Sequence, residues 1–128
     1  MGSVVRLHYT PRPPELPLGV FAEFAPGPEH EGAPGLLHGG VAATALDEVM
    51  AAVGWILDGV HCMTATLELR YRLPVPVDGT TLALEAWRDR EEARRRQRVH
   101  GRLRLHDGRL AVEANGIFVQ VAEGRIST

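Results

Sequence analysis

The segment from His38 to Asp47 carries the residues most suggestive of chemistry. His38 is followed by Gly39 and Gly40, and one aspartate ends the otherwise uncharged run VAATALD. Glycines at a helix start expose backbone N–H groups that can bind a developing negative charge. A carboxylate among apolar residues is costly and is usually retained for a reaction or for one specific hydrogen bond. The pattern predicts attack on a carbonyl, with the N–H groups of Gly39 and Gly40 as donors and Asp47 as nucleophile or general base.

These groups require a long helix to position them. The segment from Gly40 to about Leu57 has helical apolar spacing, with a wide apolar face and a separate stripe of small residues that carries Asp47. We expect the face to pack on a sheet and the stripe to let a ligand or another backbone approach. Glu48 lies about 100° around the helix from Asp47 and is the poorer candidate. The predicted face is Val41, Leu46, Val49, Val53, Ile56 and Leu57, and the stripe is Gly40, Ala43, Asp47, Ala51 and Gly54.

One copy of this helix cannot bring both groups to one substrate. A rise of about 1.5 Å per residue puts Asp47 roughly 13 Å along the axis from His38. A base and an oxyanion donor must both lie close to the reacting carbonyl. Two antiparallel copies related by a two-fold axis would meet this condition. We therefore expect a homodimer with two shared sites.

The rest of the chain is predicted to form strands. Residues 64–73 alternate, which predicts one face with the apolar side chains Leu67, Leu69, Tyr71 and Leu73 and an opposite face with Thr64, Thr66, Glu68, Arg70 and Arg72. Further strands are expected over 19–25, 80–90, 97–105 and 110–122, with a bulge at Gly116 and turns at 78–79 and 107–108. The predicted class is α+β, an antiparallel sheet around one long central helix. An irregular arm over 1–18 is expected to precede a single domain over 19–128.

Composition narrows the function classes. The chain has 128 residues, enough for one domain, and its formal net charge of -2 gives no indication of a nucleic-acid or membrane partner. The single cysteine, Cys62, cannot form an internal disulfide and fits a reducing, cytoplasmic compartment. The longest apolar run, Val49–Leu57, is too short to span a membrane. The histidines lack ligand spacing, so neither a metal nor another cofactor is expected.

Three segments of the sequence resemble the hotdog-fold acyl-CoA thioesterases. They are residues 31–47 (EGAPGLLHGGVAATALD), 63–67 (MTATL) and 71–74 (YRLP). The resemblance extends from about residue 19 to 121. It is greatest to the branch that holds the phenylacetate-pathway thioesterase and the human thioesterase superfamily members. It implies a hotdog-fold dimer, usually paired again into a tetramer, that hydrolyses acyl-CoA thioesters.

The resemblance also implies roles for single residues. In that branch the glycine matching Gly39 polarises the thioester carbonyl through its N–H. The aspartate matching Asp47 comes from the other subunit, and a hydroxyl residue at the position of Thr64 helps place the attacking water. His38 is expected to fix the helix start rather than to transfer protons. The match departs at Gly32, where several relatives carry an asparagine.

Other features leave alternatives open. Arg94, Arg95 and Arg96, with Arg90 and Arg98 nearby, could bind the phosphates of coenzyme A, because arginine suits bidentate phosphate contacts. The other interpretation is a solvated strand end paired with Glu91 and Glu92. A non-catalytic acyl-CoA-binding regulator on the same fold is the main alternative function. A hotdog-fold dehydratase or hydratase is a third, although those enzymes use a catalytic histidine in another arrangement.

Overall fold

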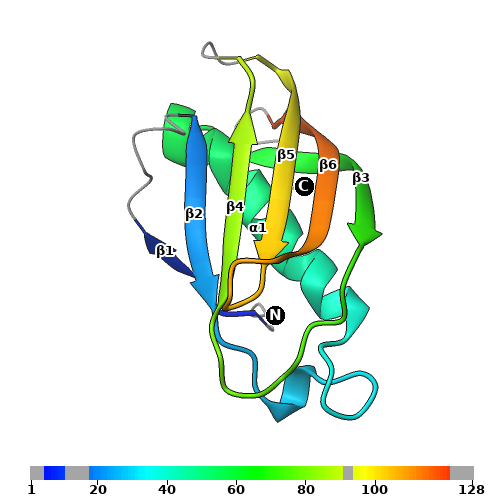
Figure 1. Ribbon diagram of the computed structural model, residues 1–128. Helices are drawn as coiled ribbons and strands as arrows, with labels where there is room; N and C mark the ends of the chain where they lie inside the picture. Colours follow the sequence, from blue (N-terminus) through cyan, green and yellow to red (C-terminus); the bar gives the residue numbers. More distant parts are fainter. Residues whose placement is uncertain (1–4, 11–17, 91–93, 122–128) are drawn as a thin grey trace.

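The computed structural model describes residues 5–10, 18–90 and 94–121 of the chain. These residues form a six-stranded antiparallel sheet in the order β1-β2-β4-β5-β6-β3, and one long helix crosses one face of it (Figure 1). A short 3₁₀ helix, η1 (Pro28–His30), lies in the loop before α1. The main elements are β1 (His8–Thr10), β2 (Gly19–Phe24), α1 (Gly39–Asp58), β3 (Cys62–Tyr71), β4 (Leu82–Arg88), β5 (Arg96–Arg104) and β6 (Leu110–Gln120).

The α+β class and the order of the elements are confirmed. The helix begins one residue before the predicted start and ends one residue after the predicted end, and five predicted strands lie within about two residues of β2 to β6. The arm is not wholly irregular, because β1 pairs antiparallel with β2. Residues 1–4 and 11–17 of the predicted arm, and the last residues of the chain from 122 on, lie outside the described part.

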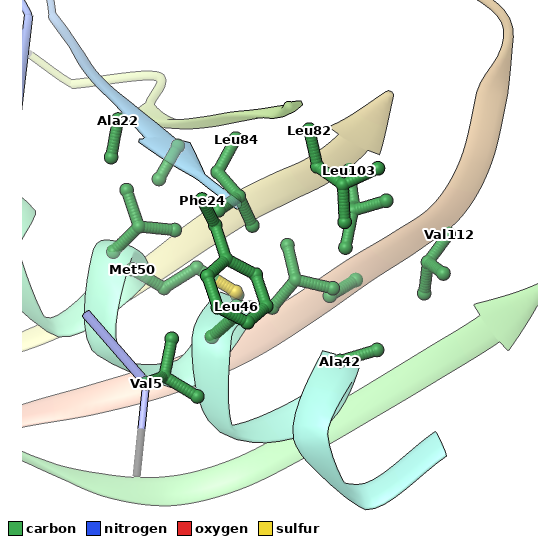
Figure 2. Packing of buried hydrophobic residues seen from close by; sticks show 14 of the residues in the cluster. Val5, Ala22, Phe24, Ala42, Leu46, Met50, Leu82, Leu84, Leu103 and Val112 are labelled. Atoms are coloured by element: carbon green, nitrogen blue, oxygen red, sulfur yellow. The ribbon is translucent and has the colours of Figure 1, made fainter. Parts of the chain in front are cut away.

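The core lies between α1 and the sheet (Figure 2). Leu46, Val49 and Val53 are buried on the helix, as predicted. Met50 packs over Gly101, where a Cβ atom would come within 2.7 Å of its Sδ, so the helix lies close to the strands. Sheet residues that complete the core include Phe24, Leu82, Leu84, Leu103, Val112 and Phe118.

The predicted apolar face of the helix was partly wrong. Ile56 remains 41% exposed and lines an open pocket beside β1 and β2. Small residues that were not assigned to the face, Ala42, Ala45 and Ala52, are buried instead, since they let the helix approach the sheet. By length and composition α1 could also cross a membrane. Its packing on the sheet accounts for the apolar composition.

A β-bulge in β3 changes which way one predicted site residue points. The pairing of β3 with β6 shifts register between Thr64 and Thr66. Thr64 therefore faces α1, on the same side as Leu67, and the strict alternation predicted for this strand was wrong. Gly116 is not itself the bulge. It lies opposite Leu67, and a Cβ atom there would come within 2.8 Å of the Thr66 carbonyl oxygen.

Candidate active site

The start of α1 is held by an unusual cap. His38 is the N-cap residue in extended conformation, and its Nδ1 accepts a hydrogen bond of 2.8 Å from the Gly40 N–H. The backbone of His38 is fixed in turn by a 2.8 Å bond from its N–H to the His30 carbonyl. Because Nδ1 is an acceptor, the proton of the neutral ring is on Nε2. His38 thus organises the helix start.

This cap corrects the assignment of Gly40 as a substrate donor. Its N–H already donates to His38, so it does not point freely at a ligand. A Cβ atom at position 40 would lie 3.0 Å from Cε1 and Nδ1 of the His38 ring. The absence of a side chain at Gly40 is therefore explained by the cap, and Gly39 is left as the candidate donor.

The N–H of Gly39 lies in the first turn of α1, where helical hydrogen bonding leaves it unpaired. In the described part of the chain it has no acceptor, whereas the Gly39 carbonyl accepts a 2.7 Å hydrogen bond from the hydroxyl of Tyr71. An apolar pocket of about 240 Å³ opens beside Gly39 and is lined by Leu37, Ala42 and Tyr71, among others. The positive end of the helix dipole favours a negative charge here.

Asp47 and Thr64 meet where α1 passes β3. The Thr64 hydroxyl donates a hydrogen bond of 2.6 Å to Oδ1 of Asp47, and both side chains are half-buried. This hydrogen bond fixes the orientation of the carboxylate. Among the described residues nothing donates to Oδ2, so that oxygen can accept a proton from water or attack a carbonyl.

The predicted residues come together as two separate pairs. His38 and Gly39 lie at the beginning of α1, and Asp47 and Thr64 lie near its middle. Asp47 comes eight positions after Gly39 in the helix, which is about 12 Å along the axis. In one chain the candidate oxyanion donor and the candidate acid therefore cannot act on the same carbonyl.

The small-residue stripe is only partly open. Gly40 is exposed and Ala43, Asp47 and Ala51 are half-buried. Gly54 is covered, because a Cβ atom there would come within 2.8 Å of the Cys62 Sγ. The open part of the stripe thus runs from Gly40 to Ala51 and includes Asp47.

The departure at Gly32 lies close to this site. A Cβ atom at position 32 would lie 3.1 Å from the Cα atom of His38. An asparagine here would therefore sit beside the helix cap. The glycine contributes no side chain beside the cap, and the side chain in contact with the Asp47 carboxylate is that of Thr64.

Arginines gather in a groove at the end of the sheet where β4 ends and β5 begins. The groove has a volume of about 580 Å³, and Arg94 lines it, whereas Arg95 does not. Ile117, at one side of the groove, donates its N–H to the Thr66 hydroxyl at the bulge of β3. Among the described residues Asp89 is the one acidic residue in the lining, beside Arg88, Arg90, Arg94, Arg96 and Arg98. Glu91 and Glu92, the alternative partners of these arginines, lie outside the described residues.

The base of this groove holds a buried ion pair that the sequence analysis missed. Arg88 is 4% exposed, and its Nη2 donates to Oδ1 of Asp58 at 2.9 Å. Its Nη1 also donates to the amide oxygen of Gln97 at 3.1 Å. The hydrogen bond from Arg88 lowers the pKa of Asp58. An aspartate in the last turn of a helix opposes the dipole, and that was the available signal that a cation lies nearby.

Comparison with known proteins places these features in a family. The family model for the thioesterase superfamily matches residues 34–112, which include both pairs. The acyl-coenzyme A thioesterase THEM4 of Xenopus laevis is 34% identical over 99 residues, which is 77% of this chain and 43% of the relative. The chain thus spans less than half the length of that curated relative.

Solved structures show the same fold. One thioesterase superfamily protein shares 32% identity with a TM-score of 0.69, covering 80% of this chain and 49% of its own. A protein from Streptococcus mutans UA159, crystallised with acetyl CoA, has 15% identity and a TM-score of 0.81, covering 95% of this chain and 94% of its own. At that identity the likeness concerns the fold alone.

Proposed function

This chain belongs to the thioesterase superfamily and has its hotdog fold, and from that premise we propose that it hydrolyses acyl-CoA thioesters to a free acid and coenzyme A. The name of the Xenopus laevis relative, an acyl-coenzyme A thioesterase, supports the substrate class. The observation that carries the proposal is the half-buried carboxylate of Asp47, oriented by Thr64 at 2.6 Å. Such a group in an apolar helix is suited to acyl transfer.

The proposed reaction uses groups of two copies of the chain. Asp47 either takes a proton from water, whose oxygen then attacks the thioester carbonyl, or attacks that carbon directly and is later released by water. The carbonyl oxygen becomes negative and accepts a hydrogen bond from the Gly39 N–H of the partner copy. The C–S bond then breaks, and the coenzyme A thiolate leaves and takes up a proton.

The free edge of β3 supports the sharing of the site. β3 is a ten-residue strand at the end of the sheet, and no other described strand pairs with its outer edge. Met63 and Tyr71 on this strand are 59% and 55% exposed. A long open edge with exposed apolar side chains favours pairing with another strand. Antiparallel pairing of two β3 edges would bring the two copies of α1 side by side. Association of such dimers into a tetramer stays a prediction made from the family resemblance.

The arginine groove is the proposed site for the coenzyme A phosphates. Four arginines line its rim, Arg90, Arg94, Arg96 and Arg98, and guanidinium groups bind phosphate with charge-assisted, often bidentate hydrogen bonds. The volume of about 580 Å³ lies in the range of small-molecule sites. The earlier assignment of Arg95 is not supported by this lining.

The test is release of coenzyme A thiol from a panel of acetyl-, hexanoyl-, palmitoyl- and phenylacetyl-CoA by the parent and by Asp47→Asn. We expect turnover of at least one substrate by the parent. We expect Asp47→Asn to lower kcat by at least 100-fold, because the amide can neither take up the proton nor attack the carbonyl.

Glu48→Gln is the matched control, since it removes the neighbouring acid on the same helix. Its kcat should stay within about twofold of the parent. Binding of the panel substrates without any thiol release would contradict hydrolysis and favour the regulator. Retained turnover in folded Asp47→Asn would contradict the proposed mechanism.

The groove can be tested by changing the substrate rather than the chemistry. Combining Arg94→Ala with Arg98→Ala should raise KM for an acyl-CoA by about 10-fold or more, because charge-assisted hydrogen bonds are lost. The KM for the same acyl group on N-acetylcysteamine, which lacks phosphates, should not change. Arg102→Ala is the control, since Arg102 lies over the Trp87 ring outside the groove. An equal rise in KM for both substrates would contradict the assignment.

A further inference from the structure

We propose that Tyr71 is a positioning residue: it holds the Gly39–Gly40 peptide by the Gly39 carbonyl and so limits how far the Gly39 N–H, on the adjoining peptide, can turn away from the substrate oxygen. This inference rests on the proposed hydrolysis. It concerns a residue for which the sequence analysis gave no role. The observation is the hydrogen bond of 2.7 Å from the Tyr71 hydroxyl to the Gly39 carbonyl, which joins the last residue of β3 to the first residue of α1.

Gly39 needs such a restraint more than another residue would. A glycine has the greatest backbone freedom, and the first turn of a helix lacks the full set of helical hydrogen bonds. The cap from His38 fixes the Gly40 N–H and leaves the Gly39 N–H unpaired. The Tyr71 hydroxyl binds the other end of the same Gly39–Gly40 peptide, the Gly39 carbonyl. With both ends of that peptide held, rotation about the backbone bonds of Gly39 is the motion that remains to be limited, and the fixed carbonyl limits it on one side.

Tyr71 is suited to act as a constant donor. Its ring lines the apolar pocket beside Gly39, with ring atoms 3.6–3.7 Å from where a Gly39 Cβ would lie. Burial of part of the side chain raises the pKa of the Tyr71 phenol above its usual value of 10.0. The hydroxyl therefore stays protonated over the whole range in which a thioesterase assay is run.

Strand β3 orients groups of α1 at two points, through Thr64 and through Tyr71. Thr64, before the bulge, donates to the carboxylate of Asp47, and Tyr71, after the bulge, donates to the Gly39 carbonyl. Both hydroxyls point from β3 to α1. One edge strand thus orients both halves of the proposed site, the acid through Thr64 and the oxyanion donor through Tyr71.

The experiment compares Tyr71→Phe with Tyr9→Phe, the same change at the other tyrosine of the chain. Tyr9 packs edge-on against Trp55 and lies outside the proposed site. With the panel substrate that the parent cleaves fastest, Tyr71→Phe should lower kcat about 3- to 10-fold, as expected for one hydrogen bond. Its KM should stay within twofold, because the ring still lines the pocket. Tyr9→Phe should change neither constant.

A second variant separates positioning from a general structural role. Gly39→Ala retains the N–H and limits the same backbone rotation, and its methyl group would meet Tyr71 only at ordinary contact distance. In the Gly39→Ala background the loss caused by Tyr71→Phe should therefore shrink to less than twofold. If Gly39→Ala is itself inactive, the kinetics of Tyr71→Phe alone test the positioning role: a lower kcat with an unchanged KM supports it.

The outcomes distinguish this inference from the proposed function. An active parent with an unchanged kcat in folded, normally assembled Tyr71→Phe would overturn the role of Tyr71 and leave the hydrolysis standing. A raised KM with unchanged kcat would also overturn it, since the residue would then serve binding alone. A parent that cleaves none of the panel would overturn both.

Discussion

At the scale of single residues, the site depends on hydroxyl groups whose direction is set by one extra residue in β3. The register shift between Thr64 and Thr66 puts two threonines of the same strand segment on opposite faces. Thr64 reaches Asp47, and Thr66 accepts the Ile117 N–H on the sheet. Bulges commonly redirect side chains next to active sites. Chemically identical neighbours therefore have different expected roles.

This difference gives a matched pair of variants. Thr64→Ala should lower kcat by about 10- to 100-fold, because the hydrogen bond it removes is made to a charged carboxylate. Thr64→Ser keeps the hydroxyl and should restore most of the rate. Thr66→Ala should leave kcat near that of the parent. Steady-state kinetics of the three variants would contradict the role of Thr64 if Thr64→Ala and Thr66→Ala behaved alike.

The predictability of the site also differs from residue to residue. The proposed roles of Asp47 and Gly39 were predictable from residue type and position in a helix, and the helix is continuous from Gly39 to Asp58. The exclusion of Gly40 did not follow, because it depends on the rotamer of the His38 ring. The direction of Thr64 was mispredicted, since alternation assumes a strand without a bulge.

At the scale of the elements, α1 is attached to the sheet at both ends as well as through its apolar face. Tyr71 binds its first residue, and Arg88 of β4 binds Asp58, its last. An acid at a helix C-terminus is unfavourable by itself, so the contact with Arg88 makes the two groups interdependent.

The extents of the elements were predictable from periodicity and turn glycines. The buried pair was not, because it joins residues 30 positions apart.

The ion pair predicts a specific response to acid. Arg88 lowers the pKa of Asp58 in the folded state below its unfolded value. Its contribution to stability is therefore complete above the unfolded pKa of about 3.9 and is lost as the pH falls through the folded pKa. Asp58→Asn should reduce the free energy of unfolding at pH 7 by about 3 kcal/mol, because Arg88 stays buried without its counter-charge.

Urea unfolding from pH 7 to pH 2 measures this effect. The difference between the parent and Asp58→Asn should shrink toward the acid end. Asp107→Asn is the control, since Asp107 also has a lowered pKa but pairs with Arg109 in an exposed turn. A destabilisation that is the same at every pH, or equal in both variants, would contradict the assignment.

At the scale of the whole molecule, the proposed dimer has a predictable strand register. Within each copy Thr64 contacts Asp47, and Tyr71 contacts Gly39. If Asp47 of one copy lies near Gly39 of the other, Thr64 of the first β3 must therefore lie beside Tyr71 of the second β3. The bulge adds one residue between Thr64 and Thr66, and this residue is left out of the count. Pairing the remaining residues inward from Thr64 and Tyr71 then places Glu68 of one copy opposite Glu68 of the other, at the two-fold axis. Directly opposed residues have Cα atoms about 4.5–5.5 Å apart, within the range for a disulfide.

Glu68→Cys in a Cys62→Ala background should therefore give a disulfide-linked dimer under mild oxidation. The measurement is a non-reducing gel beside size-exclusion chromatography. Glu23→Cys, at an exposed position of β2 near the other end of the sheet, is the control and should stay monomeric on the gel. A folded, active Glu68→Cys protein that forms no linked dimer would contradict this register.

The short strand β1 affects how many chains can associate through the edges of the sheet. It covers the far edge of the sheet with a strand of only three residues. Once two long β3 edges have joined, each outer margin offers almost no ladder for a third chain to extend. In the proposed dimer, strand pairing would then end with two molecules, because the described part of the far edge is a strand of three residues.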